Sequence, residues 1–222
     1  MKIINNYQVK SKKRVADHGE VLTAEREVNA MLDLVKQEIE RIDSRCLEPA
    51  CGNGNFLAEI LCRKLKIVQK YYNSNHNDYV KYSFLAVTSI YGVDILSDNV
   101  DECITRLFDI FINEYSAVFK NMPFDDCQQA ILYILRRNVL CGDALTMRTV
   151  DGSPIIFSEW SFVTGDLIKR RDFRFDELLQ GHQKQRTIFM DDWKYDDEIN
   201  AYIPLPMREF PPIPYTMVQN YD

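Results

Sequence analysis

The sequence predicts an α/β fold in which a mostly parallel sheet carries helices on both faces. Short apolar runs at residues 45–48, 90–95 and 138–145 have the length of buried strands, and apolar stretches with helical spacing separate them. Strands that alternate with helices form βαβ units, whose strands run parallel. An acidic residue lies at the end of each run, which is where open parallel sheets bind ligands.

The first half of the chain contains an irregular start, two helices and one strand. Residues 1–20 show no regular pattern. Thr23 is a suitable N-cap for a helix. The apolar face of that helix is expected to contain Val28, Met31, Leu32, Val35 and Ile39. Residues 45–48 form the first strand, and the helix that follows places Leu57, Ile60, Leu61, Leu65 and Val68 on one face. Polar residues 73–78 predict a loop, whereas the apolar run 84–88 fits either a strand or a helix.

The middle of the chain continues the alternation. The run 90–95 reads as a second strand, after which Ser97 or Asp98 caps a long helix. A further helix over residues 125–137 precedes the third strand. The apolar run 154–157 then predicts a short fourth strand.

The alternation stops after about residue 160. Residues 193–203 could form a small hairpin. The segment 204–214 contains five prolines and is expected to be an extended surface segment rather than part of the sheet. We therefore expect a ligand-binding domain over residues 1–160 and an irregular C-terminal extension over residues 161–222.

The composition is that of an ordinary globular protein, with 46% apolar and 27% charged residues. No apolar run is long enough to span a bilayer, and the N-terminus has no apolar signal core. Six cysteines without a Cys-x-x-Cys pair suggest reduced thiols, a cytoplasmic location and no metal site. The net charge of −6 disfavours DNA binding by the chain alone. Basic clusters within residues 1–14 and 169–174 are either solvated surface or contacts to a phosphate backbone.

The most informative stretch is residues 46–57, Cys-Leu-Glu-Pro-Ala-Cys-Gly-Asn-Gly-Asn-Phe-Leu. Two glycines at a strand-to-helix turn allow a sharp bend or the close approach of a ligand. The acid before the turn can bind an amine or a hydroxyl. The chain has neither a phosphate-binding lysine here nor a longer Gly-x-Gly-x-x-Gly pattern, which favours a nucleoside-type cofactor over a bare phosphate. The alternative is a tight turn without a ligand.

Residues 47–57 resemble the S-adenosylmethionine-binding motif of N6-adenine DNA methyltransferases, especially the modification subunits of bacterial restriction-modification systems. That motif runs (Asp/Glu)-Pro-Ala-Cys-Gly-x-Gly-x-Phe. The resemblance implies a Rossmann-like class I methyltransferase sheet, with S-adenosylmethionine as the cofactor and DNA as the substrate. The residues that match the motif are Glu48, Pro49, Ala50, Cys51, Gly52, Gly54 and Phe56.

The resemblance also implies residues for the methionine end of the cofactor. Glu48 would act near this end. Thr23 matches a family residue that contacts the methionine carboxylate, although Leu22 and Ala24 replace the usual phenylalanine and proline around it. Over the rest of residues 14–150, the resemblance lies in the order and spacing of these motif elements along the chain.

The adenosine end of the cofactor would lie over the second and third strands. By resemblance, Asp94 holds both ribose hydroxyls, because a carboxylate accepts two hydrogen bonds side by side. Ile95 would pack against one face of the adenine. Asp143 would read the adenine amino group, with Ala144 or Leu145 beside the ring.

The resemblance fails at the family's catalytic loop, (Asp/Asn)-Pro-Pro-(Tyr/Phe), which binds the adenine amine and stacks on the flipped base. This chain has Phe-Ser-Glu-Trp-Ser at residues 157–161, and the proline-rich residues 210–215 lack the amide and follow the wrong element. Ser158, Glu159 and Trp160 could replace the missing loop, with Glu159 accepting from an amine and Trp160 stacking on a base. We favour the alternative that Trp160 is core and Glu159 is surface. The sequence therefore identifies no catalytic residue.

Two functions follow from these observations. The first is an S-adenosylmethionine-dependent methyltransferase with an altered catalytic loop. The second is a non-catalytic subunit of the same fold that scaffolds or regulates a partner methyltransferase. The chain has no room for a target-recognition domain, so a specificity or catalytic protein partner is expected in either case. A methyltransferase that acts on proteins or small molecules is a third, less favoured option.

Overall fold

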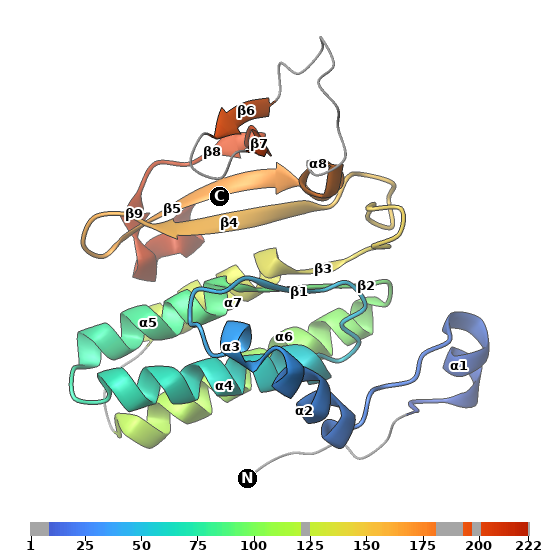
Figure 1. Cartoon of the computed structure of the whole chain (residues 1–222), viewed down its shortest axis with the longest axis horizontal. Helices are drawn as coiled ribbons and strands as arrows, with labels where there is room; N and C mark the ends of the chain where they lie inside the picture. Colours follow the sequence, from blue (N-terminus) through green and yellow to red (C-terminus); the bar gives the residue numbers. More distant parts are fainter. Residues whose placement is uncertain (1–8, 121–124, 181–192, 197–200, 222) are drawn as a thin grey trace.

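The computed structural model describes residues 9–120, 125–180, 193–196 and 201–221, and it confirms an α/β fold. Three parallel strands form one sheet in the order β1-β2-β3 (Figure 1). They are β1 (Cys46–Glu48), β2 (Ile90–Asp94) and β3 (Val139–Cys141). Glu48 lies opposite Gly92, and Asp94 lies opposite Cys141. The carboxyl ends of the three strands therefore meet at one edge of the sheet.

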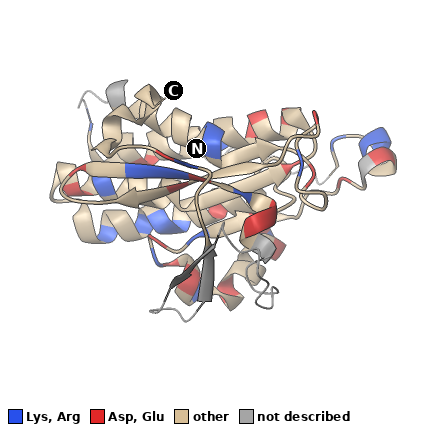
Figure 2. Ribbon diagram, turned by 90° about the horizontal axis from the view of Figure 1, so that it is seen from above, with Lys and Arg blue, Asp and Glu red and all other residues tan. Residues whose placement is uncertain are grey.

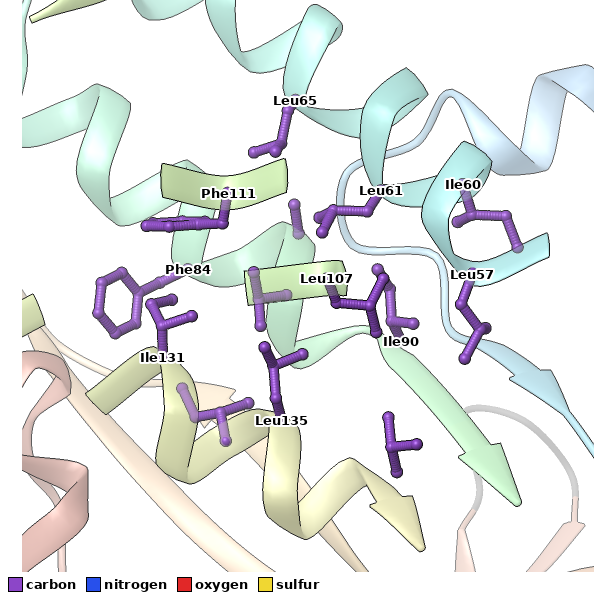
Figure 3. Packing of buried hydrophobic residues seen from close by; sticks show 14 of the residues in the cluster. Leu57, Ile60, Leu61, Leu65, Phe84, Ile90, Leu107, Phe111, Ile131 and Leu135 are labelled. Carbon is purple, nitrogen blue, oxygen red and sulfur yellow. The ribbon is translucent and has the colours of Figure 1, made fainter. Parts of the chain in front are cut away.

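Helices that precede β1 or connect the parallel strands cover one face of the sheet (Figure 1). They are α2 (Glu25–Leu34), α3 (Lys36–Ile39), α4 (Asn55–Tyr72), α5 (His76–Thr88), α6 (Ser97–Val118) and α7 (Asp125–Asn138). Their apolar faces form the main core, in which Leu57, Phe84 and Leu107 are fully buried (Figure 3). A Cβ atom on Gly92 would lie 2.8 Å from Leu57 Cδ1, so α4 rests directly on the central strand.

The other face of the sheet is covered by an antiparallel hairpin instead of the expected second layer of helices. The hairpin consists of β4 (Ile156–Phe162) and β5 (Leu167–Arg174) and is followed by α8 (Phe175–Gln180) (Figure 1). Tyr91 and Val93, which alternate with the residues that face α4, pack against Phe157 and Phe175. The Tyr91 hydroxyl donates to the carbonyl of Ser158 at 3.0 Å.

The expected fourth strand is present as β4, but it lies outside the parallel sheet, because β4 pairs antiparallel with β5 from Ile156 opposite Arg174 to Phe162 opposite Ile168. A parallel neighbour of β3 needs a crossover connection, usually a helix. Residues 142–155 contain none and fold back through bridges at Arg148. Only four residues separate β4 from β5, and a short connection of this kind favours antiparallel pairing.

The proline-rich segment also differs from expectation, because it joins the hairpin sheet. β8 (Arg208–Glu209) and β9 (Ile213–Pro214) both pair with the free edge of β5. Proline is tolerated in such edge strands because its missing N–H need not serve a second neighbour. The chain ends in a 3₁₀ helix, η1 (Tyr215–Asn220), whose buried Tyr215 and Val218 belong to the main core.

The expected small hairpin is present as β6 (Trp193–Asp196) paired antiparallel with β7 (Ala201–Pro204). The boundary expected at residue 160 falls inside β4, and β4 is paired along its length with β5.

Three N-terminal expectations are corrected. A short helix, α1 (Lys12–His18), lies in the stretch expected to be irregular. Thr23 does not cap α2; the N-cap is Ala24, which provides no side-chain hydrogen bond. Met31 and Val35 are 54% and 49% exposed, so the buried face of this region is narrower than predicted.

Two helix starts also lie elsewhere than expected. The loop expected at residues 73–78 is shortened because the Asn75 side chain caps α5 by accepting from the backbone N–H of Asn77 and Asp78. The ambiguous run 84–88 belongs to this helix. The N-cap of α6 is Leu96, so neither of the two polar residues after it caps the helix.

Candidate functional site

The glycine turn after β1 has the sharp geometry that the sequence predicts. Gly52 and Gly54 have φ values of 52° and 85°, in the left-handed region that glycine adopts without strain. The Cys51 N–H donates to the Val93 carbonyl at 2.9 Å, and the Gly52 N–H donates to Asp94 Oδ2 at 2.9 Å. These two bonds fasten the turn to the end of β2.

The remaining motif residues divide between solvent and core. Pro49 and Ala50 are exposed, whereas Cys51 is buried and Phe56 is partly buried against the core. A hydrogen bond to Cys103, together with burial, raises the pKa of the Cys51 thiol. Cys51 therefore stays neutral and acts as a small packing residue rather than as a nucleophile.

Glu48 is a half-buried carboxylate whose charge is stabilised by few hydrogen bonds or ion pairs. It accepts one long hydrogen bond, from the Ala50 N–H at 3.3 Å, and it pairs with no cation of the described chain. Burial raises the pKa of this carboxyl above its ordinary value. An amine or ammonium group placed over the turn would supply the missing partner.

We expect Glu48→Gln to raise the melting temperature at neutral pH. Burial raises the pKa of Glu48 in the folded state above its value in the unfolded chain, so the ionised form costs stability as pH rises. The gain from the glutamine should shrink as pH falls and vanish below about pH 4, where the carboxyl is protonated in both states. Thermal melts between pH 3 and 8 test this. A lower melting temperature of the variant at pH 7 would mean that the carboxylate makes a stabilising contact.

Asp94 joins the glycine turn to the start of α6. Its Oδ1 accepts from the Leu96 N–H at 2.9 Å and from Asn99 Nδ2 at 3.1 Å. Among the described residues, its Oδ2 accepts from the Gly52 N–H alone. A carboxylate oxygen has two lone pairs, so Oδ2 retains one acceptor position. The geometry suits one hydroxyl rather than the two that the resemblance implies.

The end of β3 lies beside Asp94, because the Gly142 N–H donates to the Asp94 carbonyl at 2.9 Å. Asp143 accepts from the Leu145 N–H and from Thr146 Oγ1, at 2.9 and 3.0 Å. These two bonds lower the pKa of Asp143 and hold its carboxylate in its own turn. The turn leaves Leu145 92% exposed.

The two other apolar residues expected to contact the adenine ring, Ala144 and Ile95, differ in their exposure. Ala144 packs under the hairpin with Tyr91, whereas Ile95 is 52% exposed. Ile95 and Leu145 are therefore the candidates at this edge with exposed apolar surface. Thr23 lies next to the turn through its backbone, since Asn55 Nδ2 donates to its carbonyl at 2.8 Å.

The replacements considered for the catalytic loop all have structural roles. Ser158 is buried and donates to Asp172 Oδ1 at 2.8 Å. Trp160 is buried, as favoured, and its Nε1 donates to Asn138 Oδ1 at 2.9 Å. Glu159 differs from expectation, because it is largely buried in ion pairs with Arg45 and Arg171, each at 2.5 Å.

The basic cluster of β5 is also neutralised within the molecule (Figure 2). Each of its four cations pairs with at least one acid: Lys169 with Glu209, Arg170 with Asp172, Arg171 with Glu159, and Arg174 with Asp176 and Glu177. This weakens its role as a contact to a phosphate backbone. Residues 1–8, which hold part of the other basic cluster, lie outside the described residues.

Sequence reasoning missed a set of polar residues beside Asp94. Asn99 is 1% exposed and connects Asp94 to Lys10, Arg14 and Glu20. The basic cluster within residues 1–14 includes Lys10 and Arg14, but no motif linked it to Asp94, because Asn99 lies far from it along the chain. The only signal was an asparagine on an otherwise apolar helix face.

Other features of the described residues point to no different site. A shallow hollow of about 470 Å³ lies at the opposite end of α4 from the glycine turn, lined by Ile67, Tyr71 and Tyr72 among others. The described part of the chain contains neither a group of side chains that could hold a metal ion nor a helix able to cross a membrane. Comparisons with family models, curated proteins and solved structures find no match.

Proposed function

We propose that this chain binds S-adenosylmethionine at the carboxyl edge of its parallel sheet and serves DNA adenine methylation. One observation carries the proposal: Glu48 and Asp94 end two of the adjacent parallel strands and Asp143 closely follows the third, beside a left-handed glycine turn. Glu48 has no cationic partner among the described residues. Parallel strands joined by helices also support a Rossmann-like arrangement.

The residues fit the chemical groups of this cofactor. Glu48 would bind the ammonium group of the methionine part, and Asp94 Oδ2 would accept one ribose hydroxyl. The exposed side chains of Ile95 and Leu145 provide apolar surface for a purine ring. When bound, S-adenosylmethionine supplies a methyl group on a positively charged sulfur. The chain's own part is to bind and orient that molecule.

Glu48 is a sharper probe of this site than Asp94, since Asp94 also holds the turn and the start of α6. We expect micromolar binding of S-adenosylhomocysteine to the wild type in a calorimetric titration. Glu48→Gln should weaken binding about tenfold or more, because it removes a charge-assisted hydrogen bond. Glu40→Gln, which neutralises an acid remote from the turn, is the matched control.

The pH dependence gives a second readout. Protonation of Glu48 removes the charge that binds the ammonium group, so wild-type affinity should fall as the pH is lowered. Because burial raises the pKa of Glu48, this fall should begin at a higher pH than the ordinary pKa of a glutamate would give. The affinity of Glu48→Gln should not show this pH dependence. A wild type that binds no S-adenosylhomocysteine would refute the proposed function. Equal affinities of the wild type and Glu48→Gln would refute the role of Glu48 only.

The second candidate function is a non-catalytic subunit that works with a partner methyltransferase. It is favoured by the position of β1, which pairs with β2 alone in the part of the chain that the structure describes and leaves Leu47 41% exposed. Ligand crevices in open sheets lie where the strand order reverses, and the order β1-β2-β3 contains no reversal. A parallel strand from a partner protein, placed beside β1, would create one next to the glycine turn.

The non-catalytic candidate is also supported by the residues at the place of the catalytic loop. Their side chains make structural contacts within the fold; they are Ser158, Glu159 and Trp160. The discriminating experiment incubates the chain with DNA and S-adenosylmethionine labelled in its methyl group. Robust transfer by the chain alone would eliminate the non-catalytic candidate. Cofactor binding without transfer would favour it.

A further inference from the structure

Residues 10–22, here called the N-terminal strap, are held to the molecule mainly by polar contacts. The strap contains α1, which projects from the body in Figure 1. None of the side chains described in α1 is buried, and both basic and acidic residues lie on it (Figure 2). With little apolar burial, such a segment belongs to the least stable part of a fold.

One end of the strap is attached to the first turn of α6. Asn99 Nδ2 donates to Glu20 Oε1 at 2.7 Å, and Asn99 Oδ1 accepts from Lys10 Nζ at 2.8 Å and from Arg14 Nη2 at 3.1 Å. The same Nδ2 donates to Asp94 Oδ1. Asn99 therefore links the carboxylate at the end of β2 to three charged residues of the strap.

Arg14 is the central cation of this attachment. Its guanidinium pairs with Glu20 at 2.5 Å and also with Asp98. The pair with Asp98 joins the strap to α6, and the pair with Glu20 holds the strap to itself; direct hydrogen bonds strengthen both. Lys13, on the same helix, is exposed and pairs with no acid of the described chain.

The other end of the strap lies over the glycine turn. Leu22 is 8% exposed, and a Cβ atom on Gly52 would lie 3.0 Å from Leu22 Cδ2. The next residue, Thr23, is tied to the start of α4 through Asn55. The strap thus lies beside both Asp94 and the glycine turn, which the bond from the Gly52 N–H to Asp94 Oδ2 joins to each other.

The polar cluster under the strap has unused capacity for a ligand. Lys10 and Arg14 contact three acids, namely Glu20, Asp98 and Glu102, and Asn99 joins a fourth, Asp94, to the cluster. Asn53 is 2% exposed, and its Oδ1 has no hydrogen-bond partner, while its Nδ2 donates to Glu102 at 3.0 Å. A surplus of negative charge and an unsatisfied acceptor favour a cationic, hydroxyl-bearing ligand over an anionic one.

We propose that the N-terminal strap closes over a nucleoside ligand held at Asp94, with Asn99 and Arg14 as positioning residues. This inference rests on the proposed function. Asn99 holds Asp94 Oδ1 through a hydrogen bond, so the remaining acceptor position of Oδ2 is available to the ligand. Leu22 covers the glycine turn. Closure and ligand binding are then coupled, so whatever loosens the strap weakens binding, and the ligand protects the strap.

The test compares Arg14→Gln with Lys13→Gln, which removes the same charge from the same helix without breaking an ion pair seen among the described residues. The probe is S-adenosylhomocysteine. Its affinity is measured by calorimetry, and hydrogen exchange of residues 12–19 is measured with and without it. Thermal melting checks that both variants are folded under the conditions of the titration.

The wild type and Lys13→Gln should bind equally, whereas Arg14→Gln should bind about tenfold more weakly, within the usual range for coupled sites. The ligand should slow exchange of residues 12–19 in the first two proteins and much less in Arg14→Gln. Without ligand, added salt should speed this exchange, because partly exposed ion pairs are screened.

Two results would overturn the proposal in distinguishable ways. If the wild type binds the probe but exchange of residues 12–19 is unchanged, or Arg14→Gln binds equally well, the strap plays no part in the site. If no protein binds the probe at all, the proposed function and the closure fail together.

Discussion

Gly54→Ala is expected to lower the free energy of unfolding by about 3 kcal/mol. At this position φ is 85°, and a Cβ atom would lie 2.6 Å from Cys103 Sγ and 3.3 Å from Cys103 Cβ. The alanine would be strained in the left-handed region and would also push against α6, whose buried Cys103 has little room to move. Urea denaturation of the two proteins measures the difference.

Gly152→Ala is the matched control, because it measures the cost of a left-handed alanine backbone without any steric contact of the new Cβ atom. Gly152 has a φ of 83°, and a Cβ atom there would meet nothing within 4 Å. Its substitution should cost only about 1 kcal/mol, from the left-handed backbone alone. Equal losses at both positions would mean that the glycine turn can move away from α6. The contact between the turn and Cys103 would then not be what holds the turn in place.

The parts of the fold that could be predicted are those that adjacent residues encode. The turn at Gly52 and Gly54 was recognisable because two glycines follow an apolar run and precede a helical pattern. The helices α4, α6 and α7 were recognisable from apolar residues that recur with the helical period. The strands β1, β2 and β3 were recognisable as short apolar runs between those helices.

The second layer could not be predicted, because strand pairing depends on distant partners. The run that forms β4 is apolar enough for a buried parallel strand. Its neighbour β5 carries Lys169, Arg170 and Arg171, a pattern typical of surface. Arg170 is nevertheless 2% exposed. Lys64 likewise lies on the buried face of α4, where its ammonium binds the carbonyls of Ile42 and Ser44. No local pattern indicates that such cations are satisfied inside the fold.

The candidate site was predictable only in outline. The acids at strand ends follow from the sequence, but their hydrogen bonds do not. Asp94 is largely used by its own turn, and Glu48 is the one of the three left nearly without partners. The role of Asn99 depends on contacts with strap residues that lie 79 to 89 residues away in sequence. Contacts of this range become visible only in the folded chain.

Arg170 is the residue that joins the hairpin to the helical layer. Its guanidinium binds both carboxylate oxygens of Asp172, at 2.8 and 2.7 Å, and donates to the Tyr133 hydroxyl on α7 at 2.6 Å. It also lies over the ring of Phe210, 4.2 Å from the centroid. All these contacts are shielded from water, so the charge of Asp172 depends on this partner.

We expect Arg170→Met to destabilise the protein by about 4 kcal/mol, because it leaves the Asp172 carboxylate buried without a counter-charge. In urea denaturation the double variant Arg170→Met/Asp172→Leu should recover most of this loss, since an apolar pair needs no compensation. Lys169→Met is the control on the neighbouring residue. Its ion pair with Glu209 is partly exposed, and its removal should cost less than about 1 kcal/mol. If Arg170→Met lost no more stability than Lys169→Met, or if the double variant were less stable than the single one, the uncompensated Asp172 charge would not be the cause. The hairpin would then be held to the helices chiefly by Trp160 and its apolar neighbours.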